Sequence, residues 1–513
     1  MPTFEPLAES LRCDVCVVGA GITGLTCAYL LCKEGKSVIV LDDGPLSSGE
    51  TQRTTAHITN VIDDRFFEIE RMHGLKKAQL ALESQTAAIE QIDSIVRLES
   101  IDCDFLRLDG YLFLGERHAK SLLERELSSA RRLGFQGAEM VEELPLSSSI
   151  KSPAIRFPDQ AQFHVLKYLR GIVNACLRDG CRLFTETHVT GIEGDAPLYV
   201  HTQQGFFVDA ESVIIATNSP ITDWVKVHTK QAAYRTYVIA CRIPRGSVPI
   251  ALYWDTDDPY HYVRLQDMPG DPVSQMMIVG GEDHKTGQKD DGENRFEKLQ
   301  QFAKTFLPSA GDAEYRWSGQ VYEPVDALGF IGKDPGHKGN VYIATGDSGM
   351  GMTHGTMSGI ILRDLILGRD NPWADLYNPS RKVLSASVEY LKENVNAMTQ
   401  YAAFFTPPET ESVSNLKAGE GRVITRDGEK IAACRDLNGT LHEHSAYCPH
   451  LRGIVAWNSL EQSWDCPVHG SRFTADGRVI DGPANEDLRP AKHRLEEEEE
   501  EEKRNQQRHK RAS

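Results

Sequence analysis

The sequence predicts a large α/β protein that carries a small all-β module close to its C-terminus. Three observations lead to this prediction. An apolar strand runs directly into a glycine-rich turn and a helix, the middle of the chain is rich in alternating strands, and two short motifs near the end each pair a cysteine with a histidine. Since about 150 residues make a typical domain, the 513 residues suggest about three domains.

Composition and charge argue against several classes of protein. The formal net charge is −18, of which the tail at 496–513, with seven acidic and five basic residues, contributes −2. We expect no nucleic-acid partner and no membrane partner, since nucleic acids and anionic bilayers bind basic surfaces. No apolar run approaches the roughly 20 residues that span a bilayer, and the N-terminus lacks the apolar stretch of a secretory signal. The eleven scattered cysteines favour a reducing compartment, so we expect a cytoplasmic protein.

The first 43 residues have the pattern of a nucleotide-binding βαβ unit. The strand Cys13–Val18 runs into Gly19-Ala-Gly-Ile-Thr-Gly24, which is followed by a helix at 25–34 and a second strand at 37–41. Asp42 ends that strand, where its carboxylate can accept hydrogen bonds from a ribose.

Each glycine of this motif has a physical reason. Gly19 permits the tight turn, Gly21 lets the backbone approach a pyrophosphate, and Gly24 lets the helix pack closely on the strand. The N–H groups and dipole at the helix N-terminus favour the phosphate anion. The motif alone does not separate NAD from FAD, and a glycine-rich turn without a ligand is the alternative.

Further elements are expected along the rest of the chain. Helices are predicted at 66–74, 78–99, 119–133 and 380–405, and strands at 110–114, 212–216, 237–242, 251–254, 261–265, 276–280 and 340–345. A second glycine-rich loop, at 346–355, leads into a helix that ends near Gly368. The proline-rich stretch at 407–412 indicates a linker, and the glutamate-led tail at 496–513 is expected to be disordered.

Residues 10–375 resemble the flavoproteins of the D-amino-acid-oxidase-like, or DadA-like, family. Beyond the first βαβ unit, the resemblance rests on Ser48-Gly-Glu-Thr-Gln-Arg53, Ile215-Ala-Thr217, Trp317-Ser-Gly319, Pro324-Val-Asp-Ala-Leu-Gly-Phe-Ile-Gly332 and the loop at 346–355. Two stretches are most similar to the members that carry a C-terminal iron–sulfur domain: Leu252-Tyr-Trp-Asp255 and Gly280-Gly-Glu-Asp-His284.

The resemblance implies an α/β Rossmann-like FAD-binding domain with an inserted mixed β-sheet substrate domain. The FAD-binding parts would lie at about 10–100, 155–230 and 317–370, the substrate-domain parts at about 100–155 and 231–315, and a helix and linker at 376–412. FAD contacts are implied from both ends of the domain. They are Gly19, Ala20, Gly21, Ile22, Thr23, Gly24, Asp42, Asp43, Arg53, Thr54, Ala216, Thr217, Gly346, Gly349, Gly351, Met352 and Thr353.

Two Cys–His motifs near the end of the chain indicate a metal centre. Cys448-Pro-His450 is followed, after fifteen residues, by Cys466-Pro-Val-His469. Two cysteines and two histidines can hold zinc or a Rieske [2Fe–2S] cluster. Zinc fingers group Cys with Cys and His with His, whereas each motif here supplies one of each, and this spacing favours the cluster.

Residues 413–490 resemble a Rieske domain of the ferredoxin type, which implies an all-β domain over about 413–495. The resemblance includes Trp464-Asp-Cys-Pro467, His469-Gly-Ser-Arg-Phe473 and Gly482-Pro-Ala484. It implies that Cys448 and Cys466 bind one iron and that His450 and His469 bind the other. It also implies that Ser471 bonds a cluster sulfur and that Pro483 lies in a shielding loop.

The departures from the Rieske pattern are informative. Respiratory-type domains carry one extra cysteine in each loop and join the two by a disulfide, and the corresponding residues here are Gly453 and Val468. Both cysteines are missing together, which is consistent with a reducing compartment. Arg452 replaces a usual glycine beside the cluster, and its charge should favour the reduced form.

Candidate substrate contacts lie in the strand-rich middle of the chain. Tyr260, Tyr262 and Arg264 alternate along a strand and so share one face, where Tyr262 and Arg264 can clamp a carboxylate. A surface-facing strand is an equal alternative. His354, and also His284, can handle protons, although a structural role is the simpler interpretation of both. A covalent flavin link at His57 is not expected, because the family positions that carry one align nearer Arg53.

The two cofactors together predict an oxidoreductase. FAD accepts two electrons as hydride and a [2Fe–2S] cluster accepts one at a time, so we expect a dehydrogenase that relays electrons from a small amine or amino-acid-like substrate to an external acceptor. Electrons could also run from the cluster to the flavin. The alternatives are a redox sensor or electron-transfer protein with a vestigial substrate site, and a zinc-binding flavoprotein.

Overall fold

The computed structural model describes residues 1–146, 150–222, 226–382, 387–400 and 413–492. The described chain forms two compact units. The larger contains Met1–His284 and Asp291–Leu391, and the smaller contains Lys285–Asp290 and the described residues from Lys392 onward. The expected linker at 407–412 and the tail at 496–513 lie outside the described residues. No described helix is long and apolar enough to cross a bilayer.

The nucleotide-binding sheet of the larger unit has the strand order β16-β17-β10-β1-β2-β7. Neighbours from β17 to β7 are parallel, β16 is antiparallel to β17, and β8 and β9 extend β10 as an antiparallel flap. The strands are β1 Leu11–Val18, β2 Val38–Leu41, β7 Arg182–Phe184, β8 Val189–Glu193, β9 Leu198–Thr202, β10 Phe207–Ile215, β16 Phe330–Lys333 and β17 Val341–Thr345.

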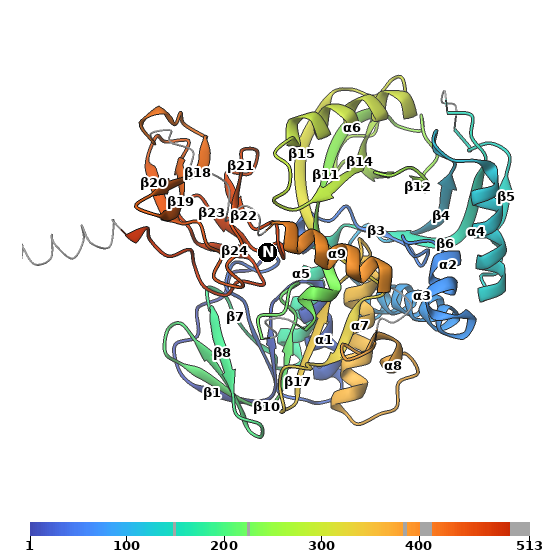
Figure 1. Cartoon of the computed structure of the whole chain (residues 1–513). Coiled ribbons are helices and arrows are strands. Elements are labelled where there is room, and N and C mark those ends of the chain that lie inside the picture. Colours follow the sequence, from blue (N-terminus) through green and yellow to red (C-terminus); the bar gives the residue numbers. More distant parts are fainter. Residues whose placement is uncertain (147–149, 223–225, 383–386, 401–412, 493–513) are drawn as a thin grey trace, which may run out of the picture. The chain divides into compact units, whose positions relative to one another are not determined.

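Helices cover this sheet, and two of them pack unusually closely because of glycines. A Cβ atom at Gly355 of α7 would lie 2.8 Å from Ile22 of α1, and one at Gly359 would lie 2.8 Å from Thr26. The helices α1 and α7 therefore lie side by side (Figure 1), which brings both glycine-rich loops to the same sheet. The main helices of the unit are α1 Ile22–Lys33, α2 Phe66–His73, α3 Leu75–Leu98, α4 Lys120–Leu133, α5 Val165–Arg178, α6 Gly292–Phe306, α7 Gly351–Ile366 and α8 Ala374–Tyr377.

A second, mixed sheet completes the larger unit. Its order is β15-β11-β14-β13-β12-β4-β6-β3, with β5 paired to β6. The β12–β4 pair is parallel, whereas β11 with β15, β12 with β13, β13 with β14, and β6 with β3, β4 and β5 are antiparallel. The strands are β3 His57–Ile58, β4 Leu106–Phe113, β5 Glu139–Val141, β6 Ala154–Gln162, β11 Gln231–Pro244, β12 Leu252–Asp255, β13 His261–Asp267, β14 Ser274–Lys285 and β15 Ala313–Pro324.

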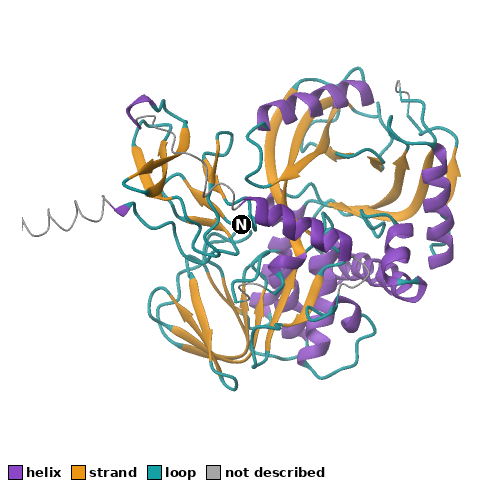
Figure 2. Cartoon of the chain, in the orientation of Figure 1, coloured by secondary structure: helices purple, strands orange, loops and turns teal. Residues whose placement is uncertain are grey.

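The smaller unit is built mainly of strands and loops (Figure 2). A row of cross-strand aromatic pairs, Trp457 with Trp464 and Trp464 with Phe473, supplies much of its core. Its two antiparallel sheets are β18-β19-β20 and β21-β22-β23-β24. The strands are β18 Gly421–Arg426, β19 Glu429–Arg435, β20 Leu441–Ser445, β21 Ala456–Asn458, β22 Ser463–Asp465, β23 Arg472–Thr474 and β24 Val479–Asp481.

The predicted fold class is confirmed. Of the helix predicted over 380–405, the described residues contain α9, Ser387–Gln400, while 383–386 and 401–405 lie outside them. Ser380 instead lies in a turn, where its N–H donates to Asn378 Oδ1 at 2.8 Å. Asparagine stabilises such turns with its own side chain and so competes with helix formation.

Candidate functional site

The glycine-rich loop between β1 and α1 has the geometry of a dinucleotide cradle. Gly19 has φ +103°, and a Cβ there would lie 2.5 Å from the carbonyl oxygen of Ala216. A Cβ at Gly24 would lie 1.9 Å from the Gly19 carbonyl oxygen, so α1 can approach β1 only with glycine at this position. The loop therefore leaves the N-terminus of α1 open at the carboxyl ends of β1 and β10, where open α/β sheets bind nucleotides.

Asp42 supports this loop directly. Its Oδ2 accepts a hydrogen bond from the Ala20 N–H at 2.5 Å, and its Oδ1 accepts one from the Gly44 N–H at 3.1 Å. Burial raises the pKa of Asp42 to about 7, against the lowering effect of these bonds. Asp43 is exposed and lies 3.7 Å from His188. Of the two predicted aspartates, Asp42 is thus the one built into the loop.

Sequence reasoning missed Thr51. Its hydroxyl accepts a hydrogen bond from the Ile22 N–H at 3.1 Å and would lie 2.9 Å from a Cβ at Gly21. It therefore lies at the helix N-terminus where a phosphate is expected. The only available signal was its place in the stretch at 48–53, which the resemblance had already singled out.

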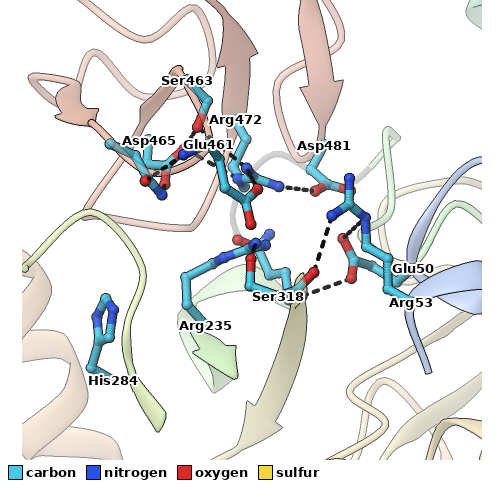
Figure 3. A network of polar contacts seen from close by, with 12 residues as sticks. Glu50, Arg53, Arg235, His284, Ser318, Glu461, Ser463, Asp465, Arg472 and Asp481 are labelled. Carbon is cyan, nitrogen blue, oxygen red and sulfur yellow. Dashed lines mark hydrogen bonds and ion pairs between the residues drawn. The ribbon is translucent and has the colours of Figure 1, made fainter. Parts of the chain in front are cut away.

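Arg53 joins the loop after β2 to the second sheet. Its Nη1 donates to the Ser318 carbonyl oxygen at 3.0 Å (Figure 3). The Trp317 indole N–H donates to the Arg53 carbonyl oxygen at 2.7 Å. Glu50 accepts from the Gln320 N–H at 2.7 Å, and Thr54 caps the same segment. These bonds fix the segment 50–54 (η1 Glu50–Arg53) against β15.

The late glycine-rich loop meets the second sheet. A Cβ at Gly349, which has φ +73°, would lie 3.1 Å from Asp63 Oδ2 and 3.6 Å from the Tyr260 hydroxyl. The remaining predicted FAD contacts of this region lie in three places. Gly346 directly follows β17, Ala216 and Thr217 directly follow β10, and Gly351, Met352 and Thr353 begin α7.

His354 is buried beneath this loop. A Cβ at Gly329 would lie 2.3 Å from its Nε2, and that nitrogen has no hydrogen-bond partner in the described part of the chain. Burial lowers the pKa of His354 to about 4, so the imidazole is neutral at pH 7. His284, by contrast, shares a 2.9 Å hydrogen bond with the Tyr237 hydroxyl.

On the predicted face of β13 and the residue before it, Arg264 is buried and Tyr260 and Tyr262 are half-buried. Tyr260 and Tyr262 lie with ring centroids 5.9 Å apart. Tyr262 covers Gly280 of β14, where a Cβ would lie 2.3 Å from its hydroxyl. The ring of His57 contacts that of Tyr262 edge-on, with the ring centroids 5.9 Å apart. Burial lowers the pKa of His57 to about 3.

The guanidinium group of Arg264 is buried, and only some of its N–H donors form hydrogen bonds with the described residues. The residue is 5% exposed, and its Nη2 donates to Gln266 Oε1 at 3.1 Å. Its Nε and Nη1 have no hydrogen-bond partner among the described residues. Desolvation lowers the pKa of Arg264 to about 10, and the group is still charged at pH 7. Because an unpaired buried donor is costly, this arrangement indicates an anion site.

Two carboxyl groups near the same tyrosines were also missed. Asp63 lies close to Tyr260, and Asp283 of β14 lies close to Thr236, which also neighbours Tyr262. Asp283 Oδ1 has no hydrogen-bond partner in the described chain. Burial raises the pKa of Asp283 to about 7, so it exists in both protonation states near neutrality. Asp283 belongs to the stretch at 280–284 that the resemblance singled out, whereas Asp63 lies in no such stretch, and no local pattern in the sequence indicates that the two residues lie near the same tyrosines.

The structure brings the predicted cluster ligands together as a pair of histidines and a pair of cysteines. Cys448 and His450 lie in the loop between β20 and β21, and Cys466 and His469 lie in the loop between β22 and β23. The two imidazole centroids are 5.0 Å apart, and the two thiols lie close to each other. Two cysteines and two histidines are the donor set of a Rieske [2Fe–2S] cluster.

The surroundings of these loops explain the departures from the Rieske pattern. A Cβ at Gly453 would lie 2.6 Å from the Val468 side chain and 2.9 Å from Cys466 Sγ, so a valine packs against the backbone where other members have a disulfide. Arg452 has φ +60° and lies 4.9 Å from the centroid of the Tyr447 ring. This positive φ accounts for the glycine usual at that position.

Ser471 connects the second ligand loop to the loop that contains Pro483. Its hydroxyl lies close to the Cys448 thiol and accepts a hydrogen bond from the Ala484 N–H at 3.0 Å. It is fully buried. This location suits a hydroxyl that bonds a cluster sulfur. The residues present therefore fit a [2Fe–2S] cluster, and the loop of β1 and α1 fits the pyrophosphate of a dinucleotide.

Taken together, the two sites define a flavoprotein oxidoreductase joined to an iron–sulfur module, and comparisons with known proteins agree. The family of FAD-dependent oxidoreductases matches residues 14–365, and the Rieske [2Fe–2S] domain matches residues 408–492. The chain is 31% identical over 499 residues to a putative Rieske 2Fe-2S iron–sulfur protein, YhfW of Bacillus subtilis, with 95% of each chain covered.

Other similarities cover the larger part alone. Gamma-glutamylputrescine oxidoreductase of Escherichia coli is 25% identical over 378 residues, covering 71% of this chain and 86% of that protein. The fold is similar to that of glycine oxidase from Geobacillus kaustophilus, with a TM-score of 0.60, 16% identity, and coverage of 73% of this chain and all of that one. The chain belongs to the FAD-dependent oxidoreductase family and carries a C-terminal Rieske domain. Its cofactors are FAD and a [2Fe–2S] cluster.

Proposed function

We propose that this protein is a dehydrogenase for a small amine that carries a carboxylate group. Two electrons leave the amine as it becomes an imine, and they pass through FAD and then, one at a time, through the Rieske cluster to an external acceptor. Cys448, His450, Cys466 and His469 are the proposed cluster ligands. The residues proposed to contact FAD are those of the two glycine-rich loops, together with Asp42, Thr51 and Arg53.

The observation that carries the proposal is the Arg264 guanidinium. It is buried on the inner face of the second sheet, and two of its nitrogens have no hydrogen-bond partner among the described residues. A substrate carboxylate would accept hydrogen bonds from those donors and so offset the free-energy cost of burying the charged guanidinium. The name of the Escherichia coli relative, which specifies an oxidoreductase for an amine, supports the same substrate class.

The other residues of this face have complementary roles in the proposal. Tyr262 donates from its hydroxyl to the bound carboxylate. Asp283 Oδ1, with a pKa of about 7, receives the proton that the ammonium group must lose before oxidation, and Asp63 stabilises the ammonium before that step. The imidazole of His354 is neutral at pH 7. We assign its Nε2 the role of forming a hydrogen bond, as donor or acceptor, that orients the bound reactants. When bound, FAD supplies the hydride acceptor and the cluster supplies the one-electron exit.

Anaerobic reduction of the purified protein tests the proposal. Each amino acid is compared with its counterpart that lacks the carboxylate: glycine with methylamine, proline with pyrrolidine, and γ-aminobutyrate with propylamine. Loss of the oxidised flavin absorption is followed in the wild type, in Arg264→Met, and in the control Arg316→Met, whose side chain is 48% exposed.

We expect a carboxylate-bearing amine to reduce the wild type and the Arg316 variant, and to lose at least 100-fold in apparent affinity with the Arg264 variant, since charged hydrogen bonds contribute about 1.5–3 kcal/mol each. Flavin reduction should precede the appearance of the reduced-cluster EPR signal. If no amine reduces a flavin that dithionite does reduce, the redox-sensor alternative holds instead. Equal reduction by both members of a pair would remove Arg264 from substrate recognition.

A further inference from the structure

Six residues of the smaller unit come from far outside its sequence range. Lys285–Asp290 connects the end of β14 to the start of α6, yet its contacts place it with the Rieske domain. Lys285 forms an ion pair with Glu393 of α9, and Gln288 Nε2 donates to Asn396 Oδ1 of the same helix at 2.8 Å. The segment therefore belongs to the iron–sulfur unit by structure, although not by sequence.

The segment touches the second ligand loop through backbone atoms. Gly287 has φ +70°, and a Cβ there would lie 2.8 Å from the Asp465 carbonyl oxygen, 2.8 Å from the Pro467 nitrogen and 3.0 Å from the Pro467 Cα. Cys466 lies between these two residues. Only glycine allows this approach, because any side chain would displace backbone and would also disfavour the positive φ.

Three further hydrogen bonds hold this loop and the hairpin that leads into it. Gln288 Nε2 donates to the Pro467 carbonyl oxygen at 3.4 Å. Asp290 Oδ1 accepts from both the N–H and the hydroxyl of Ser459, at 3.0 and 2.8 Å, in the turn between β21 and β22. The hairpin that ends in Cys466 is thus held at its turn and at its ligand end by one short segment.

From these contacts we infer that Lys285–Asp290 is a positioning segment of the iron–sulfur site. Gly287 and Gln288 fix the backbone of Asp465–Pro467 and keep water from it, and so set the orientation of Cys466. The reduction potential of an iron–sulfur cluster depends on the geometry around its sulfur ligands, on hydrogen bonds and on solvent exposure. This part of the oxidoreductase sequence therefore tunes a cluster whose ligands begin about 160 residues later.

The test uses the full-length protein with both cofactors. Gly287→Ala is compared with Gly246→Ala, a matched control in which φ is +77° and no atom lies within 4 Å of the new Cβ. Both variants bear the same backbone cost, but only the first collides with the ligand loop. The midpoint potential and the g values of the reduced cluster are measured by EPR-monitored redox titration.

We expect Gly287→Ala to shift both the potential and the g values while Gly246→Ala matches the wild type. Gln288→Ala, which removes two hydrogen bonds without a collision, should shift them in a smaller but measurable way. Backbone hydrogen exchange in a peptide spanning 463–473 should rise in both segment variants. If Gly287→Ala fails to fold, Gln288→Ala decides the matter. A wild-type potential, spectrum and exchange rate in Gln288→Ala would overturn the inference.

Discussion

Arg472 is the residue whose removal should most clearly separate the stability of the Rieske domain from that of the rest of the chain. Its side chain is 1% exposed and lies among three carboxylates (Figure 3). Nε donates to Asp465 at 3.1 Å, Nη1 contacts Asp481 at 3.4 Å, and Nη2 bonds both Glu461 and Ser463. Asp465 directly precedes the proposed ligand Cys466, so this network holds the loop that contains Cys466 and His469.

The magnitude follows from burial. Removing one partner of a buried ion pair costs about 3–5 kcal/mol, because the remaining charge has no compensation. The side chains of Asp465, Asp481 and Glu461 are 2%, 11% and 15% exposed. In the variant, Asp465 would still accept hydrogen bonds from Ser463 and Asn458, each at 2.9 Å. These bonds partly stabilise the remaining charge and so reduce the expected loss of stability. We therefore expect Arg472→Met to lower the free energy of unfolding of the domain by about 3 kcal/mol.

Denaturant unfolding followed by the visible circular dichroism of the cluster measures this loss. The control is Arg478→Met in the same domain, whose ion pair with Asp476 at 3.0 Å involves an arginine that is 71% exposed. It should change stability by less than about 1 kcal/mol. Arg472→Lys should recover part of the loss, because it restores the charge but not the planar fork. Equal midpoints for Arg472→Met and Arg478→Met would refute the reasoning.

Three further outcomes are expected. Gly24→Ala places a Cβ 1.9 Å from the Gly19 carbonyl oxygen and should abolish FAD binding, measured as flavin content per chain; normal content would contradict the role of the loop. Cys448→Ser should remove the Rieske EPR signal and leave the flavin spectrum intact, and a retained signal would exclude Cys448 as a ligand. At His261, desolvation is outweighed by carboxylate hydrogen bonds, chiefly to Asp255, which raise its pKa from 6.5 to about 9. This shift means that protonated His261 stabilises the fold by about 3 kcal/mol below pH 6.5 and that this contribution is lost as the pH rises through 9. The unfolding free energies of the wild type and His261→Gln should therefore converge at alkaline pH. A difference that stays constant with pH would show that the charge of His261 is not involved.

Much of the dinucleotide and cluster sites could be predicted because their signals are local. The turn after β1 needs glycine where φ is positive or the backbone is crowded, and these needs are met within six consecutive residues. The two predicted ligand loops are likewise recognisable from the sequence, because each contains a cysteine and a histidine at short spacing. The sequence also located the two positions at which respiratory-type domains carry their disulfide, Gly453 and Val468. These two residues lie together in the structure.

The substrate face was only half predictable. Strand alternation placed Tyr260, Tyr262 and Arg264 on one face, but it left open whether that face was buried. The acidic residues Asp63 and Asp283 come from other segments, and nothing in the sequence around them indicates that they lie near these tyrosines. Which carboxyl groups share a location depends on how the strands pair, and strand pairing is not encoded in any single stretch of sequence.

By itself, the sequence determined the two cofactor classes and the order of the parts along the chain, since backbone conformation at glycine and metal-ligand chemistry are properties of neighbouring residues. Only the tertiary structure decided which charges are buried with unpaired donors, as at Arg264, and which distant segments meet. Gln288 and Pro467 are separated by 179 residues and form one hydrogen bond. Such contacts depend on the packing of whole sheets and helices, because desolvation and close backbone approach arise only when the chain is folded.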